Sequence, residues 1–476
     1  MNNIHKRNLI AVAMLFIAGC AMGPDYQRPD IDLPNSYPSA AATDAASAIP
    51  HDWWKLYNDP VLNNLIDRAL ERNADVRLAV ARIEEADANL RATGAALLPE
   101  FDLGANASRA RSSAQTATPL AAGSSIVKQD LRLAVSTSFE LDFWGKLRRA
   151  TESARAQAIG SRYAKDVVTL TLAGTTAQAY FSLRSLDAQV IVTRETLASR
   201  EESLALVRQR AGAGVASDLD VSQAEGARSD ASAQLKDLQR QRAIFEHQLA
   251  SLTGKLDLQL SEGDLRKLPL PPQPPVGLPA SLLERRPDIR QAEQDLIAAS
   301  AQIGVARAAM LPTISLTGYY GGESEALSNL LNSGARIWST GFGLTLPIFD
   351  AGRLAARTDA AIARQHQSLA SYQKSIETAF REVADALTNA QQTAATETDL
   401  EASVKAARTS LRLAKSRYES GYSSFLEVLD AQRTANIAEL AVLRNRQAQL
   451  SASVDLMKVL GGGWLAAGAE SIQTAK

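Results

Sequence analysis

The side chains that could carry out catalysis are few and scattered in this chain of 476 residues. Its four histidines, at positions 5, 51, 247 and 366, do not share the spacing of a metal site, and the chain has one cysteine. The sequence contains no phosphate loop of the Walker type and no GxSxG nucleophile elbow. The glycine-rich stretch AGAGVA at 211–216 follows no predicted strand, which excludes a dinucleotide loop. The sequence therefore predicts a protein that is not an enzyme and that uses no metal and no cofactor.

The single cysteine, Cys20, is placed for acylation. Lys6 and Arg7 precede an apolar run at 9–18, which is too short to span a bilayer as a helix and leads into the sequence IAGC. This order resembles the signal of bacterial lipoproteins, in which a new N-terminal cysteine carries the lipid. We therefore expect residue 20 to carry palmitate after removal of the signal. A buried structural cysteine behind an ordinary secretory signal is the alternative. Ala21 follows in place of the aspartate associated with inner-membrane retention, so we expect the lipid to anchor the protein in the outer membrane.

The composition is typical of a folded, largely helical protein. Apolar residues make up 46% of the chain and charged residues 22%, which excludes a disordered chain and a bundle of membrane helices. The formal net charge of -1 gives no basic surface for nucleic acid. Aromatic residues are only 5%, while Ala, Gln, Arg and Glu are abundant, as in long helices that pack through small residues.

Two stretches that lie 207 positions apart share one pattern. RYESGYSSFLEVLDAQ begins at Arg417, and RAGAGVASDLDVSQA begins at Arg210. In each stretch a glycine, Gly421 or Gly214, fits the left-handed position that ends a helix, and the serine three residues later fits the N-cap of the next helix. Both stretches therefore predict a bend between two helices.

Long helical tracts precede these bends. The tracts at 147–211 and 354–418 contain no proline and would each be about 100 Å long. Tracts at 217–252 and 424–460 return over about 55 Å. Apolar residues in the second long tract recur at alternating steps of four and three, which is the spacing of a coiled-coil seam. We predict two unequal, antiparallel helical hairpins.

Four segments alternate apolar and polar residues, which is the pattern of strands with one apolar face. They lie at 100–108, 130–143, 313–321 and 337–348 and would form two hairpins. One interpretation is a sheet that covers helices in a soluble domain. The other is part of a transmembrane barrel, whose strands need about 9 to 11 residues. Since the smallest barrels need about eight strands, several chains would have to share such a barrel.

These elements occur in two tandem halves. We predict a signal peptide at 1–19 and an N-terminal leader at 20–60, followed by a first repeat at 61–267. A proline-rich linker at 268–280 then leads to a second repeat at 281–463 and a C-terminal tail at 464–476. The prolines of the linker forbid helix and favour an extended strap. A repeat of about 210 residues is too long for a solenoid unit and indicates a duplicated domain.

Several motifs together resemble the TolC and OprM family of outer-membrane efflux channels, in its NodT-like lipoprotein branch. They are the lipobox, WWKLYNDPVL, LLERRPDIRQAE, LLPEFDL, MLPTISL, LPIFDAGR and RYESGYSSFLEVLDAQ, and they cover nearly the whole mature chain. The resemblance implies a mainly helical fold with a small β part. It implies a homotrimer in which each chain gives four strands to a shared twelve-stranded barrel, continued through the periplasm by a long coiled-coil tunnel.

The same resemblance implies a passive duct. Drugs or other toxic small molecules would leave the periplasm through it, energised by an inner-membrane pump of the resistance-nodulation-division type through a periplasmic adaptor. The alternatives are a non-channel lipoprotein scaffold and the outer-membrane duct of a type I protein secretion system. Two hairpins that match each other in arm length, together with four alternating strands, favour the channel over the scaffold. Nothing in the sequence separates the classes of cargo.

The resemblance also assigns a closed tip to the bends. In the family, acidic residues just after the second bend narrow the lumen, and the matching positions are Glu427 and Asp430, beside the apolar Leu426. Solvated carboxylates near a helix N-terminus are the alternative. Links between the two bends hold the tip closed in the family, and Tyr418 and Asp220 match one such pair.

A second link of the family involves an arginine that this chain lacks, since Ser423 stands at that position. The residues repeated at both bends are expected to form the rim that faces the adaptor. They are Arg210, Gly214, Arg417 and Gly421.

Overall fold

The computed structural model describes residues 21–34, 37, 49–113, 115, 125–272 and 282–462. The chain divides into two compact units. The first comprises Met1–Asp30, Arg82–Ser161 and Ala292–Tyr372, and the second comprises Ile31–Ala81, Arg162–Gln291 and Gln373–Lys476. Within the described ranges, no helix combines the length and the apolar character needed to cross a membrane.

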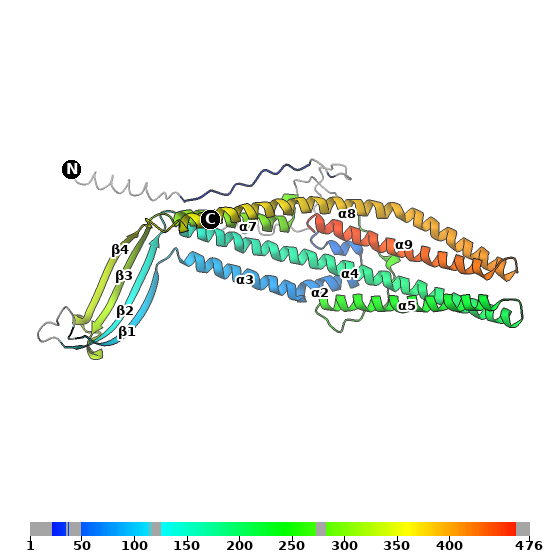
Figure 1. Ribbon diagram of the computed structural model, residues 1–476, viewed down its shortest axis with the longest axis horizontal. Helices are drawn as coiled ribbons and strands as arrows, with labels where there is room; N and C mark the ends of the chain where they lie inside the picture. Colours follow the sequence, from blue (N-terminus) through cyan, green and yellow to red (C-terminus); the bar gives the residue numbers. More distant parts are fainter. Residues whose placement is uncertain are drawn as a thin grey trace. The chain divides into compact units, whose positions relative to one another are not determined.

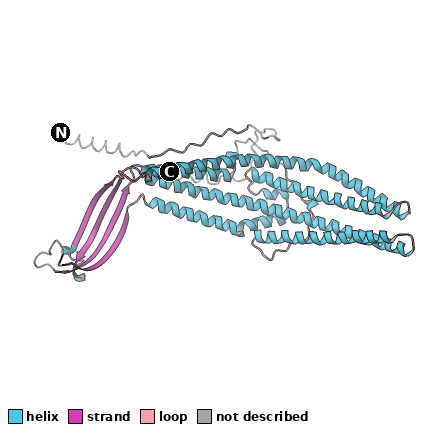
Figure 2. Cartoon of the chain, in the orientation of Figure 1, coloured by secondary structure: helices cyan, strands magenta, loops and turns pink. Residues whose placement is uncertain are grey.

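Two helical hairpins make up most of the second unit, and the first residues of their long arms belong to the first unit (Figures 1 and 2). Helix α4 (Lys146–Gly212) returns as α5 (Asp218–Leu252), and α8 (Arg353–Glu419) returns as α9 (Phe425–Val459). The long arms have 67 residues each and the short arms 35. These bounds lie within one residue of the predicted tracts. Because these tracts contain no proline, every residue in them has a backbone N–H that it can donate within the helix. The predicted lengths of the helices are confirmed.

Both bends end their long helix in the same way. Gly214 and Gly421 have φ values of +73° and +80°, a conformation that costs glycine nothing because it has no Cβ. The residue after each glycine donates its N–H to the carbonyl oxygen of Arg210 or of Arg417, at 2.9 and 2.8 Å. This bond satisfies a carbonyl that the helix leaves without a partner. The left-handed conformation predicted for the two glycines is confirmed.

Serines stand at the start of both returning helices. Ser217 and Asp220 form a capping box: the Asp220 N–H donates to Ser217 Oγ at 3.2 Å, and the Ser217 N–H donates to Asp220 Oδ2 at 3.0 Å. Ser424 has the extended backbone of an N-cap, but its side chain makes no capping hydrogen bond. The N-cap prediction is therefore confirmed in position at both serines, whereas a capping side chain is found only at the first.

Shorter helices complete the helical part. In the second unit they are η1 (Trp53–Tyr57), α2 (Pro60–Arg72), η2 (Leu265–Lys267) and α6 (Leu282–Arg285), while α3 (Ala74–Ala95) and α7 (Pro287–Ala308) contribute residues to both units. Tyr57 is fully buried, its ring centroid lies 5.0 Å from that of Phe181, and its hydroxyl is hydrogen-bonded to Ser453 Oγ at 2.6 Å. An aromatic cluster thus attaches η1 to α4 and α9.

A fully buried carboxylate joins the loop after α5 to the first hairpin. Asp187 of α4 accepts hydrogen bonds from Arg184 at 2.9 Å, from Arg242 of α5 at 2.7 Å and from the backbone N–H of Gly263 at 3.0 Å. A buried carboxylate is tolerated only where its oxygens are satisfied in this way. Neither the aromatic cluster nor this ion cluster was predicted.

The first unit contains a four-stranded antiparallel sheet in the order β1-β2-β3-β4 (Figure 2). Its strands are β1 (Glu100–Arg111), β2 (Val127–Leu141), β3 (Thr313–Ser324) and β4 (Arg336–Thr345), with the short helices η4 (Leu327–Asn329) and η5 (Ser333–Ala335) between β3 and β4. Both predicted hairpins are confirmed. The pairing of β2 with β3 joins the two halves of the sequence in one sheet.

The last strand is shorter than predicted. It ends at Thr345, whereas the alternation predicted a strand to residue 348. Pro347 has no N–H to donate to a neighbouring strand, and β3 begins only at Thr313, the partner of Thr345. Continued alternation of apolar residues beyond the last pair therefore does not extend the strand.

The register places the apolar residues of all four strands on one face of the sheet. Leu103 is opposite Val135, which is opposite Tyr320, which is opposite Trp338. Residues directly opposite one another point to the same side. These four side chains are 72%, 43%, 60% and 70% exposed. This row of apolar side chains is therefore not covered by a helix of the described part of the chain, which disfavours the interpretation as a soluble sheet.

Candidate functional site at the helical bends

The predicted gate residues lie in the first two turns of α9. Leu426 is 58% exposed, and the side chains of Glu427 and Asp430 are 51% and 62% exposed. Positions 426 and 430, and positions 427 and 430, are neighbours on a helix surface. The three residues thus form one exposed patch, with Glu427 in the first turn, where the helix dipole favours a negative charge.

Each of the two gate carboxylates has an arginine of the same chain beside it. Arg433 Nη2 lies 2.6 Å from Asp430 Oδ1, and Arg417 Nε lies 3.7 Å from Glu427 Oε2. Neither arginine was predicted as a partner of these acids. Arg433 stands three residues after Asp430, a spacing that indicates a possible helix pair, so this signal was present in the sequence. The gate patch therefore carries charges of both signs.

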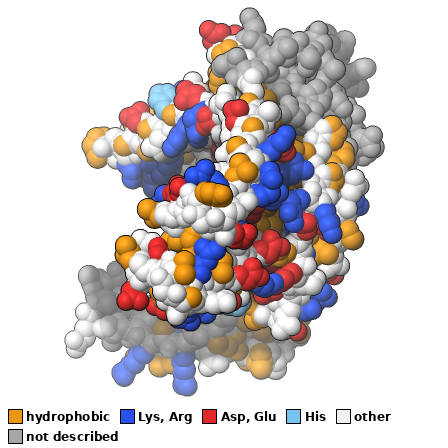
Figure 3. Space-filling model, turned by 90° about the vertical axis from the view of Figure 1, so that its right-hand side faces the viewer, with side chains coloured by type: hydrophobic (Ala, Val, Ile, Leu, Met, Phe, Trp, Pro, Cys, Tyr) orange, Lys and Arg blue, Asp and Glu red, His pale blue; other side chains and the backbone are white. Residues whose placement is uncertain are grey.

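The view onto the ends of the hairpins shows this mixture over a wider area (Figure 3). Basic and acidic side chains are interspersed there, with hydrophobic side chains between them. Among the exposed apolar residues at the bends, Val215 and Tyr422 occupy equivalent positions in the two repeats, as do Leu219 and Leu426. The bends thus present a repeated set of apolar side chains beside the predicted rim residues.

The two residues of the predicted tip link have other partners within the chain. Asp220 is occupied by its capping box, and its Oδ2 also accepts the Ser217 hydroxyl at 2.8 Å. Tyr418 is 8% exposed and packs on Phe425, with ring centroids 5.4 Å apart. No hydrogen bond between Tyr418 and Asp220 is found among the described residues, so their link stays a prediction. The hydroxyl of Ser423 is buried and makes no hydrogen bond within the described part of the chain.

Arg210 connects the two bends directly. Its Nη1 donates to the carbonyl oxygen of Tyr418 and its Nη2 to that of Glu419, both at 3.0 Å. Its guanidinium carbon also lies 4.6 Å from the centroid of the Tyr418 ring. This contact could not be found from the sequence, because Arg210 and Tyr418 are 208 residues apart.

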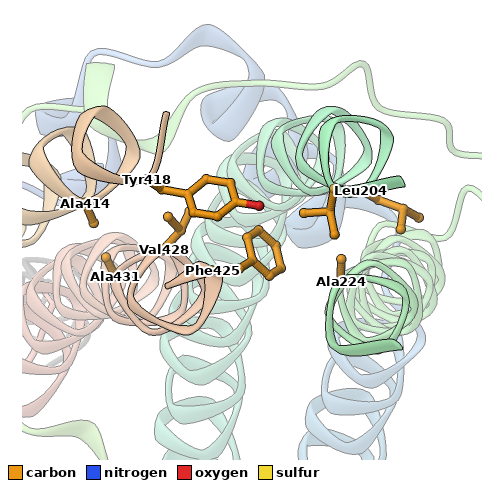
Figure 4. Packing of buried hydrophobic residues seen from close by; sticks show 8 residues of the cluster. Leu204, Ala224, Ala414, Tyr418, Phe425, Val428 and Ala431 are labelled. Atoms are coloured by element: carbon orange, nitrogen blue, oxygen red, sulfur yellow. The ribbon is translucent and has the colours of Figure 1, made fainter. Parts of the chain in front are cut away.

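The hairpins share a hydrophobic core just behind this contact (Figure 4). It contains residues of all four long helices, with Leu204, Val207 and Ala224 from the first hairpin and Ala414, Tyr418, Phe425, Val428 and Ala431 from the second. Tyr418 and Phe425 project between the hairpins (Figure 4). The first gate residue, Leu426, directly follows a residue of this core.

The lipidation site lies outside the described residues, so the acylation of Cys20 stays a prediction. The segment that follows it is held at the start of α4. Met22 N–H donates to Trp144 O at 3.0 Å, and Arg149 donates to Asp25 Oδ1 at 2.5 Å and to Met22 O at 3.3 Å. Residues 22–25 are therefore fixed beside the junction of β2 and α4.

Comparison with known proteins identifies the family. The family model described as outer membrane efflux protein matches residues 65–255 and 278–462. The chain belongs to this family. The two matched segments overlap the two predicted repeats, and the family assignment made from the sequence motifs is confirmed.

Individual relatives agree with this assignment. The chain is 38% identical over 456 residues to outer membrane protein OprJ of Pseudomonas aeruginosa, covering 94% of each chain. It is 36% identical over 470 residues to the solvent efflux pump outer membrane protein SrpC of Pseudomonas putida, covering 96% of this chain and 98% of the relative. The crystal structure of the Campylobacter jejuni CmeC outer membrane channel matches with a TM-score of 0.87 and 26% identity, over 96% of this chain and 98% of that one. The protein is thus an outer-membrane efflux component and not an enzyme.

Proposed function

We propose that three copies of this chain form the outer-membrane duct of a tripartite efflux pump. The sheet supports the trimer, because it has four strands, two edge strands that pair with no other described segment, and an exposed apolar face. Unpaired edges and open apolar faces are liabilities unless another chain or lipid covers them. Three sheets would supply twelve strands, enough to close a barrel with its apolar face toward lipid.

The oligomeric state tests this part of the proposal. Full-length protein extracted from outer membranes in a mild detergent is expected to show the mass of three chains by native mass spectrometry. A lipid adduct on each chain that disappears in Cys20→Ser would support acylation. A monodisperse monomer that keeps its helical content would contradict the shared barrel.

The duct carries small organic molecules in this proposal. Relatives with 36% identity over 96% of this chain are named solvent and toluene efflux pump outer membrane proteins. A passive duct does not bind its cargo tightly, so we assign the chain a class of cargo, apolar solvents and drugs, and no single compound. An inner-membrane pump of the resistance-nodulation-division type would supply the energy through a periplasmic adaptor.

The rim at the bends is the proposed contact with the adaptor. Arg210, Gly214, Arg417 and Gly421 occupy equivalent positions of the two repeats, as an adaptor that meets both hairpins requires. Charge reversal at Arg417 is expected to impair efflux while the amount of trimer in the outer membrane stays unchanged. Efflux that survives reversal of Arg417 and of Arg210 would place the adaptor contact elsewhere.

The gate is proposed to lie at the same end. Three copies of Leu426, Glu427 and Asp430 would narrow the lumen just beyond the rim. The mixed charges described above support a gate that is held together by ion pairs instead of being opened by repulsion between carboxylates.

A further inference from the structure

We infer that Arg210, in addition to the shared core and to the hydrogen bonds of Lys415 with Ser199 and of Gln432 with Ser203, holds the two hairpins of a protomer together at the tip and thereby keeps the gate residues in the closed position. The inference rests on the proposed function, because it assigns a role in closing the duct. Arg210 and Arg417 occupy the same place in the two repeats, yet their side chains have different partners.

Arg417 stays within its own hairpin. Its guanidinium lies near Glu427 at 3.7 Å, a distance too long for a direct hydrogen bond, and its side chain is 59% exposed. Arg210 instead reaches the other hairpin and donates two hydrogen bonds at 3.0 Å to successive carbonyl oxygens. Only the first repeat therefore supplies a bond between the hairpins at this position.

The acceptors of Arg210 explain why an arginine is suited to the task. Tyr418 and Glu419 are the last two residues of α8, and the last carbonyl groups of a helix lack partners within the helix. They also form the negative end of the helix dipole, which favours a cation. A planar guanidinium can bond to two such oxygens at once while it stacks on an aromatic ring, as it does on Tyr418. A lysine has no equivalent fork.

The contact is connected to the gate by packing. Tyr418, whose backbone and ring both contact Arg210, packs on Phe425 with ring centroids 5.4 Å apart. Phe425 is 2% exposed and directly precedes Leu426 and Glu427. A movement of the gate residues away from the first hairpin must therefore displace Phe425 from Tyr418 or Tyr418 from Arg210.

A nearby arginine supplies a matched control. Arg208 lies on α4 two residues before Arg210 and has the same charge, but its guanidinium contacts Glu225 of the same hairpin at 2.6 Å. Arg208→Gln therefore removes one positive charge from the same tip without breaking a bond between the hairpins. Arg210→Gln removes the charge together with both bonds to α8.

Single-channel recording of purified full-length trimers in planar bilayers tests the inference without adaptor or pump. We expect Arg210→Gln to raise the ratio of open to closed time about tenfold, which corresponds to about 1.4 kcal/mol. Arg210→Lys should give a smaller rise, because it keeps the charge and loses the fork. Arg208→Gln should leave the ratio within about twofold of the wild type, which is the scale of an exposed ion pair. The thermal midpoint of each trimer is measured alongside, and a midpoint that stays at the wild-type value in Arg210→Gln separates gating from general loosening.

Two results would overturn the inference. One is an open-to-closed ratio in Arg210→Gln, or in Arg210→Lys if the glutamine variant does not assemble, that equals the wild-type ratio. The other is an equal rise in Arg208→Gln and Arg210→Gln, which would indicate a general effect of charge at the tip. Because the wild-type channel is recorded in the same experiment, either result leaves the proposed duct intact.

Discussion

Removal of the gate carboxylates is expected to reverse the ion selectivity of the duct. The perturbation is the double variant Glu427→Ala and Asp430→Ala. Each chain places Arg433 at 2.6 Å from Asp430 and Arg417 at 3.7 Å from Glu427. Three copies would therefore bring together equal numbers of carboxylates and guanidiniums. The double variant leaves the guanidiniums without their partners.

The size of the effect follows from the charges. One unit charge about 4 Å from a permeating ion changes the energy of that ion by about 1 kcal/mol in water, and this alters its local concentration roughly fivefold. In the wild type the paired arginines offset most of this effect, so we expect weak cation selectivity. In the double variant the remaining positive charge should lower the permeability ratio of potassium to chloride by about fivefold or more, to a value below one.

The assay is the reversal potential of trimers in planar bilayers under a gradient of potassium chloride. A change in the sign of the reversal potential is the expected result for the double variant. Arg433→Gln is the matched opposite change and should increase cation selectivity, because it leaves Asp430 unpaired. A double variant with the reversal potential of the wild type would show that Glu427 and Asp430 do not line the conducting path.

Three further outcomes are expected. Asp187→Ala removes the fully buried carboxylate that pairs the buried Arg184 and the half-buried Arg242, so the free energy of unfolding should fall by about 3 to 5 kcal/mol in chemical unfolding. Glu201→Ala removes an exposed partner of Arg228 and should change this free energy by about 1 kcal/mol or less, and equal effects would contradict the role of burial. Phe342→Arg places a charge on the apolar face of β4, which costs about 2 to 4 kcal/mol if the residue meets the lipid core, so the amount of trimer in outer membranes should drop. Ser339→Arg on the opposite face of the strand should be tolerated. Equal trimer levels in the two variants would contradict a lipid-facing sheet. Cys20→Ser should abolish labelling with radioactive palmitate, and labelling that persists would refute acylation at this residue.

The helical hairpins were predictable because their signals are local. Each bend carries a glycine for the left-handed position and, three residues later, a serine for the N-cap, at Gly214 and Ser217 and again at Gly421 and Ser424. The absence of proline from the long tracts then fixed the lengths of the helices. Ser424 takes the predicted N-cap position without a side-chain hydrogen bond, because the N-cap backbone does not require one.

The strands were predictable as elements but not fully as a sheet. Alternation located all four strands, and the pairing of β2 with β3 was not predicted because its register joins residues nearly two hundred positions apart, as for Val135 and Tyr320. No local pattern specifies such a pairing. The end of β4 at Thr345 depends on its partner strand, which alternation alone does not reveal.

The residues of the candidate site were found by their position in a motif, and their partners were not. Glu427 and Asp430 lie exposed at the start of α9 as expected, but the arginines beside them change the charge of the patch. The contact of Arg210 with α8 depends on how two hairpins pack, which only the structure gives. The resemblance to the family indicated which residues belong to the candidate site, whereas the structure showed which charged side chains lie beside them.

Loss and restoration of efflux in cells is the most direct test of the duct. A strain that keeps its adaptor and inner-membrane pump but lacks this chain, and has no other outer-membrane duct of the family, is loaded with a fluorescent apolar dye that the pump exports. We predict that the cells retain the dye, and that a plasmid carrying this chain restores export to the wild-type rate. Dye export that is as fast without the chain as with it would contradict the proposal that this protein carries small molecules across the outer membrane.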